Sequence, residues 1–350
     1  MMNWQGIRVA YRPYHKDCGV AGDRRRFVFY AKTRNINFEI ADPSKPYDIV
    51  YLTYGCDLGK WIAYKKANPG TKVIFELIDS YLLEDAGFFT FFRGAIRFST
   101  GKESKLYLNY KSALREMVSV CDAIVCSTPI QKQDLSRFNR NIHISLDYFS
   151  DDITQHKANY RSGGKLKLVW EGQAYTVKNL FVINDVLGQL KDEVELHIVT
   201  DPVIKYPFRI FDKKTSRLLR KLKCSYQLYD WTKPTFSRII TESDLAIIPI
   251  SSGQGIMWNK PENKLLLLWE MGIPVLTSGT PAYERVMDKA QLDFYCREPK
   301  EWIDKIRRFK NDTEDERKQK ALLADNYLHH YHSKDIILES WDGIFESILD

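Results

Sequence analysis

The sequence predicts an α/β protein with two parallel-sheet domains that face each other across a cleft, and a final helix that crosses back to the first domain. Four observations support this fold class. Short apolar segments alternate with helical patterns over nearly the whole chain. A polar stretch at residues 150–165 divides the pattern, and residues 335–349 have the apolar spacing of an amphipathic helix. A length of 350 residues suits two domains of ordinary size.

Twelve segments have the length and composition of buried strands. In the first half they are Ile7–Tyr11, Asn37–Ala41, Asp48–Tyr54, Lys72–Asp79, Ala123–Ser127 and His143–Leu146, and in the second half Leu166–Glu171, Glu195–Thr200, Ser225–Tyr229, Leu245–Ile250, Pro274–Thr277 and Asp293–Tyr295. Helical patterns such as Leu180–Leu190, Phe236–Thr241 and Trp302–Phe309 lie between them. We therefore expect Rossmann-like domains at 1–155 and 165–332, with ligands at the carboxyl ends of the strands, and a helix at 333–350 that packs on the first domain.

The most informative stretch of the chain is 259–279, which predicts a short buried helix. Pro261 suits a first turn and Gly272 a C-terminal cap, while the five residues from Leu265 to Trp269 are all apolar. The N–H groups of the first turn favour an anion, above all a phosphate. Glu262 and Glu270 enclose the helix with seven residues between them, about two turns apart on roughly one face.

This helix, followed by Gly272-Ile-Pro-Val275, resembles the signature of GT-B glycosyltransferases of the family 4 type. The resemblance covers most of Leu166–Met287. It implies that Glu262 contacts the hydroxyls of the transferred sugar as a catalytic residue, and that Glu270 accepts both ribose hydroxyls of a nucleotide. An ordinary pair of helix-surface carboxylates is the alternative.

The resemblance also implies a diphosphate site at the turn after the first strand of the second domain. Gly172 and Lys178 match the family's glycine and lysine, but Gln173 stands where the family has arginine. Lys260 or Lys264 would supply the missing cation, next to Asn263 at the helix start. The alternative for Lys178 is a solvated loop lysine.

Tyr229 and Trp231, at the end of a predicted strand, resemble the residues that flank the nucleobase in this family. Packing of Trp231 between helix and strand is the alternative.

A glycine-bearing loop follows the first predicted strand. Gly19 and Gly22 permit close backbone approach to a donor phosphate, and Asp23 suits a helix cap. The run Arg24 to Arg26 is expected to include solvated cations.

Asp79 follows the strand that begins at Lys72, at the predicted ligand edge. Its carboxylate would orient the acceptor hydroxyl, or act as its base in an inverting enzyme; the alternative is a helix cap. Members of the resembled family usually retain the configuration and need no such base.

The segment 87–98 holds five phenylalanines with Arg93 and Arg97, which suits peripheral contact with a membrane that carries the acceptor. An ordinary buried helix is the alternative.

Composition narrows the function classes. The six cysteines lack paired spacing, no apolar run approaches the roughly 20 residues of a membrane span, and the first residues run directly into a strand. We expect a cytoplasmic protein, with the inner membrane face as its one membrane contact. The net charge of +7 comes without a nucleic-acid motif, and the basic runs 213–223 and 305–310 suit solvated helix faces. His329, His330 and His332 lack partner ligands, so we predict neither nucleic acid nor a metal site.

The resulting hypothesis is a hexosyltransferase-type enzyme that moves a sugar from a nucleotide-sugar co-substrate to a glycan or lipid-linked glycan, with retention and without metal or cofactor, in cell-surface polysaccharide synthesis. A non-catalytic partner subunit that binds the sugar nucleotide is the alternative, because Gln173 replaces the arginine. A GT-B-like sugar-nucleotide epimerase is a further alternative; it would need a histidine in the cleft, for which His15 near the glycine loop is the candidate.

Overall fold

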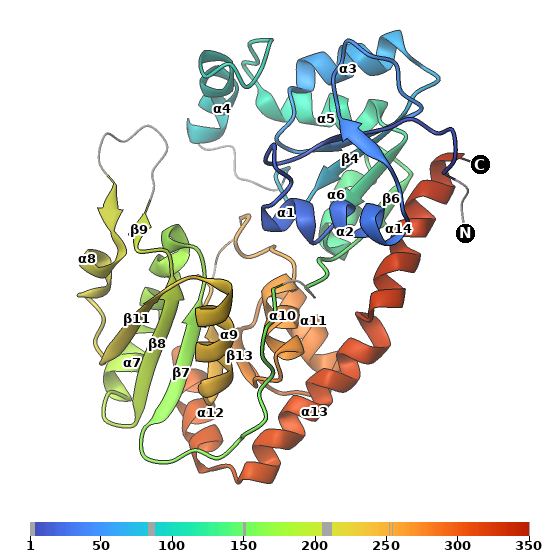
Figure 1. Cartoon of the computed structure of the whole chain (residues 1–350). Coiled ribbons are helices and arrows are strands. Elements are labelled where there is room, and N and C mark those ends of the chain that lie inside the picture. The colour runs from blue at the N-terminus through green and yellow to red at the C-terminus, as the bar shows by residue number, and fades with distance from the viewer. Residues whose placement is uncertain are drawn as a thin grey trace. The chain divides into compact units, whose positions relative to one another are not determined.

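The computed structural model describes residues 4–82, 88–149, 152–204, 212–251, 253 and 255–349, and the side chains of helix α4 from residue 93 on. The chain separates into two compact units, each with a six-stranded sheet. The first comprises Met1–Tyr148, Gln254–Pro261 and Ser333–Asp350, and the second Phe149–Gly253 and Glu262–His332. Both sheets have helices interleaved between their strands, as the sequence predicts (Figure 1).

The sheet of the first unit is parallel throughout, in the order β2-β1-β3-β4-β5-β6. Its strands are β1 Val9–Arg12, β2 Phe38–Ile40, β3 Ile49–Thr53, β4 Lys72–Leu77, β5 Ala123–Cys126 and β6 Ile142–Ile144. Its helices are α1 Ala21–Arg24, α2 Phe27–Thr33, α3 Leu58–Ala67, α4 Phe88–Ser99, α5 Tyr110–Val120, α6 Pro129–Leu135 and α14 Lys334–Leu349. Because every strand is parallel, all of their carboxyl ends lie along one edge.

The C-terminal helix α14 covers one face of this sheet. Trp341 and Phe345 stack on Tyr30 of α2, with ring centroids 5.5 and 5.3 Å apart. Asp342 accepts a hydrogen bond from the Tyr30 hydroxyl at 2.9 Å and pairs with Arg34. The amphipathic helix predicted at the C-terminus therefore completes the core of the first unit, and α3 and α5 belong to the core on the opposite face.

The sheet of the second unit is also parallel, in the order β11-β8-β7-β12-β13-β14. Its strands are β7 Leu166–Glu171, β8 Val194–Thr200, β11 Tyr226–Asp230, β12 Leu245–Ile248, β13 Val275–Ser278 and β14 Tyr295–Cys296, and an antiparallel pair is formed by β9 Val203–Ile204 and β10 Lys213–Lys214. Its helices are the 3₁₀ helix η1 Ala174–Ile183, α7 Asn184–Gln189, α8 Thr215–Leu219, α9 Lys233–Glu242, α10 Asn263–Glu270, α11 Pro281–Lys289, α12 Pro299–Asn311 and α13 Glu314–Tyr331. The helix predicted at Leu180–Leu190 is thus divided between η1 and α7.

The polar stretch predicted as a linker is packed against the second unit from residue 152 on. The Lys157 N–H donates to the Met271 carbonyl at 2.9 Å, and its ammonium donates to the Ser243 carbonyl at 2.6 Å. The Tyr160 hydroxyl donates to the Gly272 carbonyl at 2.8 Å. Polar composition predicted a connector, but these polar groups satisfy the ends of α9 and α10 instead.

Helix α10 is buried, as its apolar run predicts. Leu265 to Trp269 are all at most 5% exposed. Gly272 has a φ of +77° and its N–H donates to the Trp269 carbonyl at 2.8 Å, so glycine serves here as the C-terminal cap.

Among the described residues, no helix combines the length and apolar character that crossing a bilayer requires. The same residues contain no group of three or more His, Cys, Asp or Glu side chains arranged to hold a metal ion.

Candidate functional site

The carboxyl edge of the second sheet gathers several of the predicted donor residues. Glu262 is the N-cap residue of α10, next to Asn263 and Lys264 in the first turn. At the same edge the Ser278 hydroxyl, at the end of β13, bonds the Ile250 N–H at 2.8 Å. The first N–H groups of α10 therefore lie at the carboxyl edge of the sheet, where parallel α/β sheets bind ligands.

Glu262 is almost completely buried, with 2% of its surface exposed. The Arg285 guanidinium on α11 donates to Glu262 Oε1 at 2.6 Å, whereas Oε2 has no hydrogen-bond partner among the described residues. Burial raises the pKa of the Glu262 carboxyl, and the Arg285 cation works in the opposite direction. A buried carboxylate oxygen without a partner is costly, so this atom is suited to a hydroxyl from a ligand.

We expect Arg285→Ala to move the acid limb of binding of the predicted sugar-nucleotide ligand to higher pH by about one pH unit or more. The reason is that Arg285 lowers the pKa of Glu262, so its removal leaves more of the carboxyl protonated at weakly acidic pH. The dissociation constant measured by calorimetry across a pH series checks this. Arg285→Lys should keep most of the wild-type profile, and an unchanged limb in Arg285→Ala would contradict the role of this pair.

The turn after β7 holds a cation beside a glycine. Lys264 Nζ donates to the Glu171 carbonyl at 2.5 Å and lies 3.6 Å from Glu171 Oε2 and 5.3 Å from the centre of the Trp170 ring. A Cβ at Gly172 would lie 2.8 Å from that ring and 2.9 Å from Lys264 Nζ, so only glycine fits this approach. The structure thus places the Lys264 ammonium at the predicted diphosphate turn.

Gln173 and Lys178 also belong to the predicted diphosphate turn. Gln173 precedes the helix η1, and Lys178 lies within it. Both side chains are exposed. The exposed position of Lys178 agrees with a diphosphate contact and equally with the alternative of a solvated loop lysine.

A hollow of about 460 Å³ lies beside this turn, at the carboxyl ends of β7 and β8. It is lined by Gln173, Ala174, Tyr175, Asp201, Pro202 and Val203. Tyr175 is 52% exposed, and the Asp201 carboxylate is exposed with one long hydrogen bond, from the Ala174 N–H at 3.5 Å. An aromatic face and an ionised carboxylate in one hollow suit a nucleoside, through stacking and through the ribose diol.

The structure separates Glu270 from this edge. Eight residues of helix carry Glu270 about 12 Å along the axis from Glu262. Glu270 is exposed, and the next carbonyl, of Met271, bonds Lys157, whose ammonium bonds Ser243 just before β12 begins. Glu270 thus lies at the amino edge of the sheet. That position does not fit the ribose contact predicted for it.

The aromatic residues predicted at the nucleobase lie on the edge strand β11 and just after it. The Tyr229 ring stacks on His197 with centroids 5.7 Å apart, and its hydroxyl bonds Gln227 at 2.5 Å. Trp231 is half-buried, its N–H donates to the Thr200 carbonyl at 3.1 Å, and its ring lies 6.1 Å from Phe236. Tyr229 therefore packs on the sheet, while Trp231 remains at the carboxyl edge.

In the first unit, the glycine loop is organised by an aspartate. Asp23 is buried and accepts hydrogen bonds from the Tyr14 and His15 N–H groups at 2.8 and 3.0 Å and from the Tyr11 hydroxyl at 2.6 Å. Helix α1 begins after Val20, which makes no side-chain cap. The predicted cap is therefore wrong: Asp23 instead fastens the loop that precedes the helix.

The two glycines of this loop differ in their surroundings. A Cβ at Gly22 would lie 2.9 Å from the Tyr14 ring, so packing explains this glycine. Gly19 is exposed, and its N–H donates to Asp17 at 2.8 Å.

Arg26 departs most from expectation, because it is fully buried. Its Nε donates to Glu76 Oε1 at 2.5 Å and its Nη1 to Asp147 at 3.1 Å, and the Tyr51 hydroxyl donates to the same Glu76 oxygen at 2.9 Å. Composition suggested solvated arginines, but two carboxylates far away in the chain compensate the desolvation of this one.

Asp79 and Lys260 form an ion pair within the first unit. The ammonium lies 3.6 Å from Asp79 Oδ2. The Asp79 carbonyl accepts a hydrogen bond from Gln131 at 2.9 Å. Lys260 thus neutralises Asp79. The helix that Asp79 was predicted to cap begins at Phe88, and residues 83–87 lie outside the described part.

Of the predicted membrane segment 87–98, residue 87 and the side chains of 88–92 lie outside the described part. Arg93 donates to the Tyr54 hydroxyl at 3.0 Å. Arg97 donates to the buried Glu103 at 3.0 Å. These contacts hold α4 to the first unit, and Arg97 in particular serves an internal ion pair.

Sequence reasoning missed Arg285, Asp201 and the Glu76 network. Arg285 lies 23 residues beyond Glu262 and has no motif of its own. Asp201 did carry a signal, because it directly follows the predicted strand Glu195–Thr200.

The fold is that of known glycosyltransferases. Anabaena HepE, solved with UDP and glucose, is similar with a TM-score of 0.65 at 11% identity, over 97% of this chain and 100% of that one. WaaG, a glycosyltransferase involved in lipopolysaccharide biosynthesis, gives 0.58 at 14% identity, over 96% and 98%. TarM gives 0.58 at 12% identity over 85% of this chain, and the chain spans only 54% of TarM. TarM of S. aureus has also been solved with UDP and fondaparinux.

No family model and no curated protein sequence matches the chain. The structural similarity defines the architecture: the chain has the GT-B glycosyltransferase fold, as the sequence predicts. Its activity has to be argued from its own residues.

Proposed function

We propose that the chain is a hexosyltransferase that moves a sugar from a nucleotide-sugar donor to a glycan or lipid-linked glycan, with retention and without a metal ion, in cell-surface polysaccharide synthesis. The observation that carries the proposal is the buried Glu262 carboxylate, with one oxygen unpartnered, at the N-terminus of α10. The UDP bound in HepE and TarM makes UDP-sugars the first donors to test, and the role of WaaG supports a surface glycan.

Each part of the donor would meet a different group of the second unit. The N–H groups of α10 and the Lys264 ammonium stabilise the negative charge that grows on the leaving nucleoside diphosphate. Glu262 accepts a hydrogen bond from a sugar hydroxyl, with Arg285 holding its other oxygen. Asp201 accepts from the ribose hydroxyls in the hollow where Tyr175 offers a stacking face. The ribose role thus passes from Glu270 to Asp201.

Retention is supported by the state of Asp79. Its carboxylate is paired with the Lys260 ammonium. Taking a proton from an acceptor hydroxyl would discharge the carboxylate and leave that cation without its partner, which disfavours Asp79 as a base. In this proposal Asp79 orients an acceptor hydroxyl.

A thermal-shift panel of UDP-, GDP-, ADP-, CMP- and dTDP-sugars tests the donor site. A ligand present at 100 times its dissociation constant adds about 2.7 kcal/mol to the free energy of unfolding. We expect a UDP-sugar to stabilise the wild type, and Asp201→Asn to weaken that effect. Asp192→Asn, an exposed acid in the turn before β8, is the matched control and should behave as the wild type.

If none of these donors stabilises the wild type, the proposed donor site is wrong. Stabilisation without release of nucleoside diphosphate in the presence of any glycan acceptor would instead favour a non-catalytic partner subunit. Gln173, in place of the family's arginine, is the feature that favours this second reading.

A further inference from the structure

The positive charge of the chain is concentrated in one short segment of the second unit. The 11 residues 213–223 carry six lysines and arginines and no acid, while the whole chain has a net charge of +7. The rest of the chain therefore has a net charge of only +1. A charge this localised creates a field that the overall composition does not suggest.

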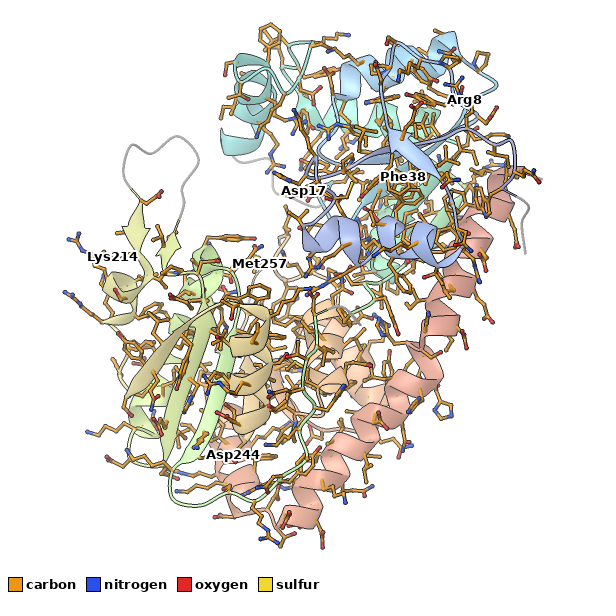
Figure 2. The ribbon with its side chains drawn as sticks, viewed as in Figure 1. Arg8, Asp17, Phe38, Lys214, Asp244 and Met257 are labelled. Carbon is orange, nitrogen blue, oxygen red and sulfur yellow. The ribbon has the colours of Figure 1, made fainter. Side chains whose placement is uncertain are left out.

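The fold keeps five of these six cations in solvent. Lys223 pairs with Asp185 at 2.5 Å, whereas within the described part of the chain no ion pair neutralises the others. These others are all exposed: Lys213, Lys214, Arg217, Arg220 and Lys221. Thr215 and Leu219 of α8 are buried, so this turn of helix directs its cations away from the core. Figure 2 shows Lys214 at the outer margin of the second unit.

The exposed face of η1 continues this cationic area. The Asn184 amide, just after η1, donates to the Lys221 carbonyl at 3.1 Å, which fixes the end of the basic segment against the end of η1. Lys178 and Val182 are both exposed on η1, and Val182 lies two residues before Asn184. Val182 is 43% exposed. We call these two residues together with the five unpaired cations the cationic face.

We propose that the cationic face docks the second unit on a bilayer surface rich in anionic phospholipid headgroups. Each lysine or arginine close to such a surface strengthens binding by about fivefold. An exposed branched apolar side chain beside the cations adds contact at the headgroup boundary. A nucleic acid would use the cations but leave Val182 without a role, so the combination favours lipid. The inference does not depend on the proposed transferase activity.

Vesicle co-sedimentation tests the proposal with two matched variants. The first carries Lys214→Gln, Arg217→Gln, Arg220→Gln and Lys221→Gln. The control carries Lys132→Gln, Lys300→Gln, Lys318→Gln and Lys334→Gln, four exposed cations on separate helices. Wild type should bind mixed phosphatidylcholine–phosphatidylglycerol vesicles, less so at high salt, and pure phosphatidylcholine only weakly. The first variant should lose about 100-fold or more in partition coefficient, and the control less than about fivefold.

Val182→Ser separates a lipid surface from other polyanions. It should weaken vesicle binding a few-fold and leave retention on a heparin column unchanged. The proposal would be overturned if the wild type did not bind the mixed vesicles. It would also be overturned if the two four-residue variants lost the same factor in partition coefficient. Tighter binding to RNA than to vesicles, together with no effect of Val182→Ser, would overturn it as well and would assign the face to a nucleic acid.

Discussion

Glu262→Gln is expected to weaken binding of the sugar nucleotide by about 10- to 100-fold, while the dissociation constant of the free nucleoside diphosphate stays within about twofold. The ionised carboxylate accepts a charge-assisted hydrogen bond from a sugar hydroxyl, and the amide replaces it with a weaker, neutral one. The free diphosphate lacks the sugar and does not meet this residue. Titration calorimetry with both ligands measures the difference.

Glu270→Gln is the matched control for this experiment. It makes the same chemical change on the same helix, at the exposed amino-edge end of α10. It should leave both dissociation constants within about twofold. Equal weakening of both ligands by Glu262→Gln, with a lower melting temperature, would show that Glu262 only anchors α10 through Arg285. A strong effect of Glu270→Gln would restore the ribose role that its position argues against.

Glu76→Leu is expected to lower the free energy of unfolding by about 3–5 kcal/mol. It removes the carboxylate that accepts from both Arg26 and Tyr51, and leaves the fully buried guanidinium with Asp147 alone. Burying a charge without adequate compensation is among the most destabilising changes in a core. Urea unfolding followed by tryptophan fluorescence provides the measurement.

Two further variants test whether the unpaired buried charge causes this loss of stability. Glu39→Gln breaks the exposed contact with Arg8, 3.7 Å long, and should change stability by less than about 1 kcal/mol. The double variant Arg26→Met with Glu76→Leu should recover part of the loss, because it no longer buries an unpaired cation. If Glu76→Leu is no less stable than Glu39→Gln, the buried network contributes nothing of this size.

The local predictions that held were those that periodicity and chain length determine. Alternating strand and helix patterns predicted the twelve strands of the two six-stranded sheets but not the short pair β9 and β10, and five consecutive apolar residues predicted that α10 is buried. Glycine at position 272 predicted the end of that helix. Each of these depends on residues close together in the chain, so sequence spacing is sufficient.

The candidate site was predicted only in part, because helical geometry and sequence motif disagree at one residue. Glu262 and Glu270 share roughly one side of α10, but the rise of the helix places them at opposite edges of the sheet. The site also recruits Arg285 and Asp201 from other elements. Spacing along one helix contains no information about either contribution.

By itself, the sequence of this protein determined two parallel α/β units, a C-terminal helix that completes the first, and a helix N-terminus suited to an anion. The tertiary structure alone decided which charges are buried in internal ion pairs and which stay exposed. The run Arg24 to Arg26 was expected to include solvated cations, but β4 and the segment after β6 bring Glu76 and Asp147 to Arg26, while the cations of 213–221 remain exposed. The physical reason is that the free energy of a charge depends on burial and on partners distant in sequence, which composition and periodicity do not specify.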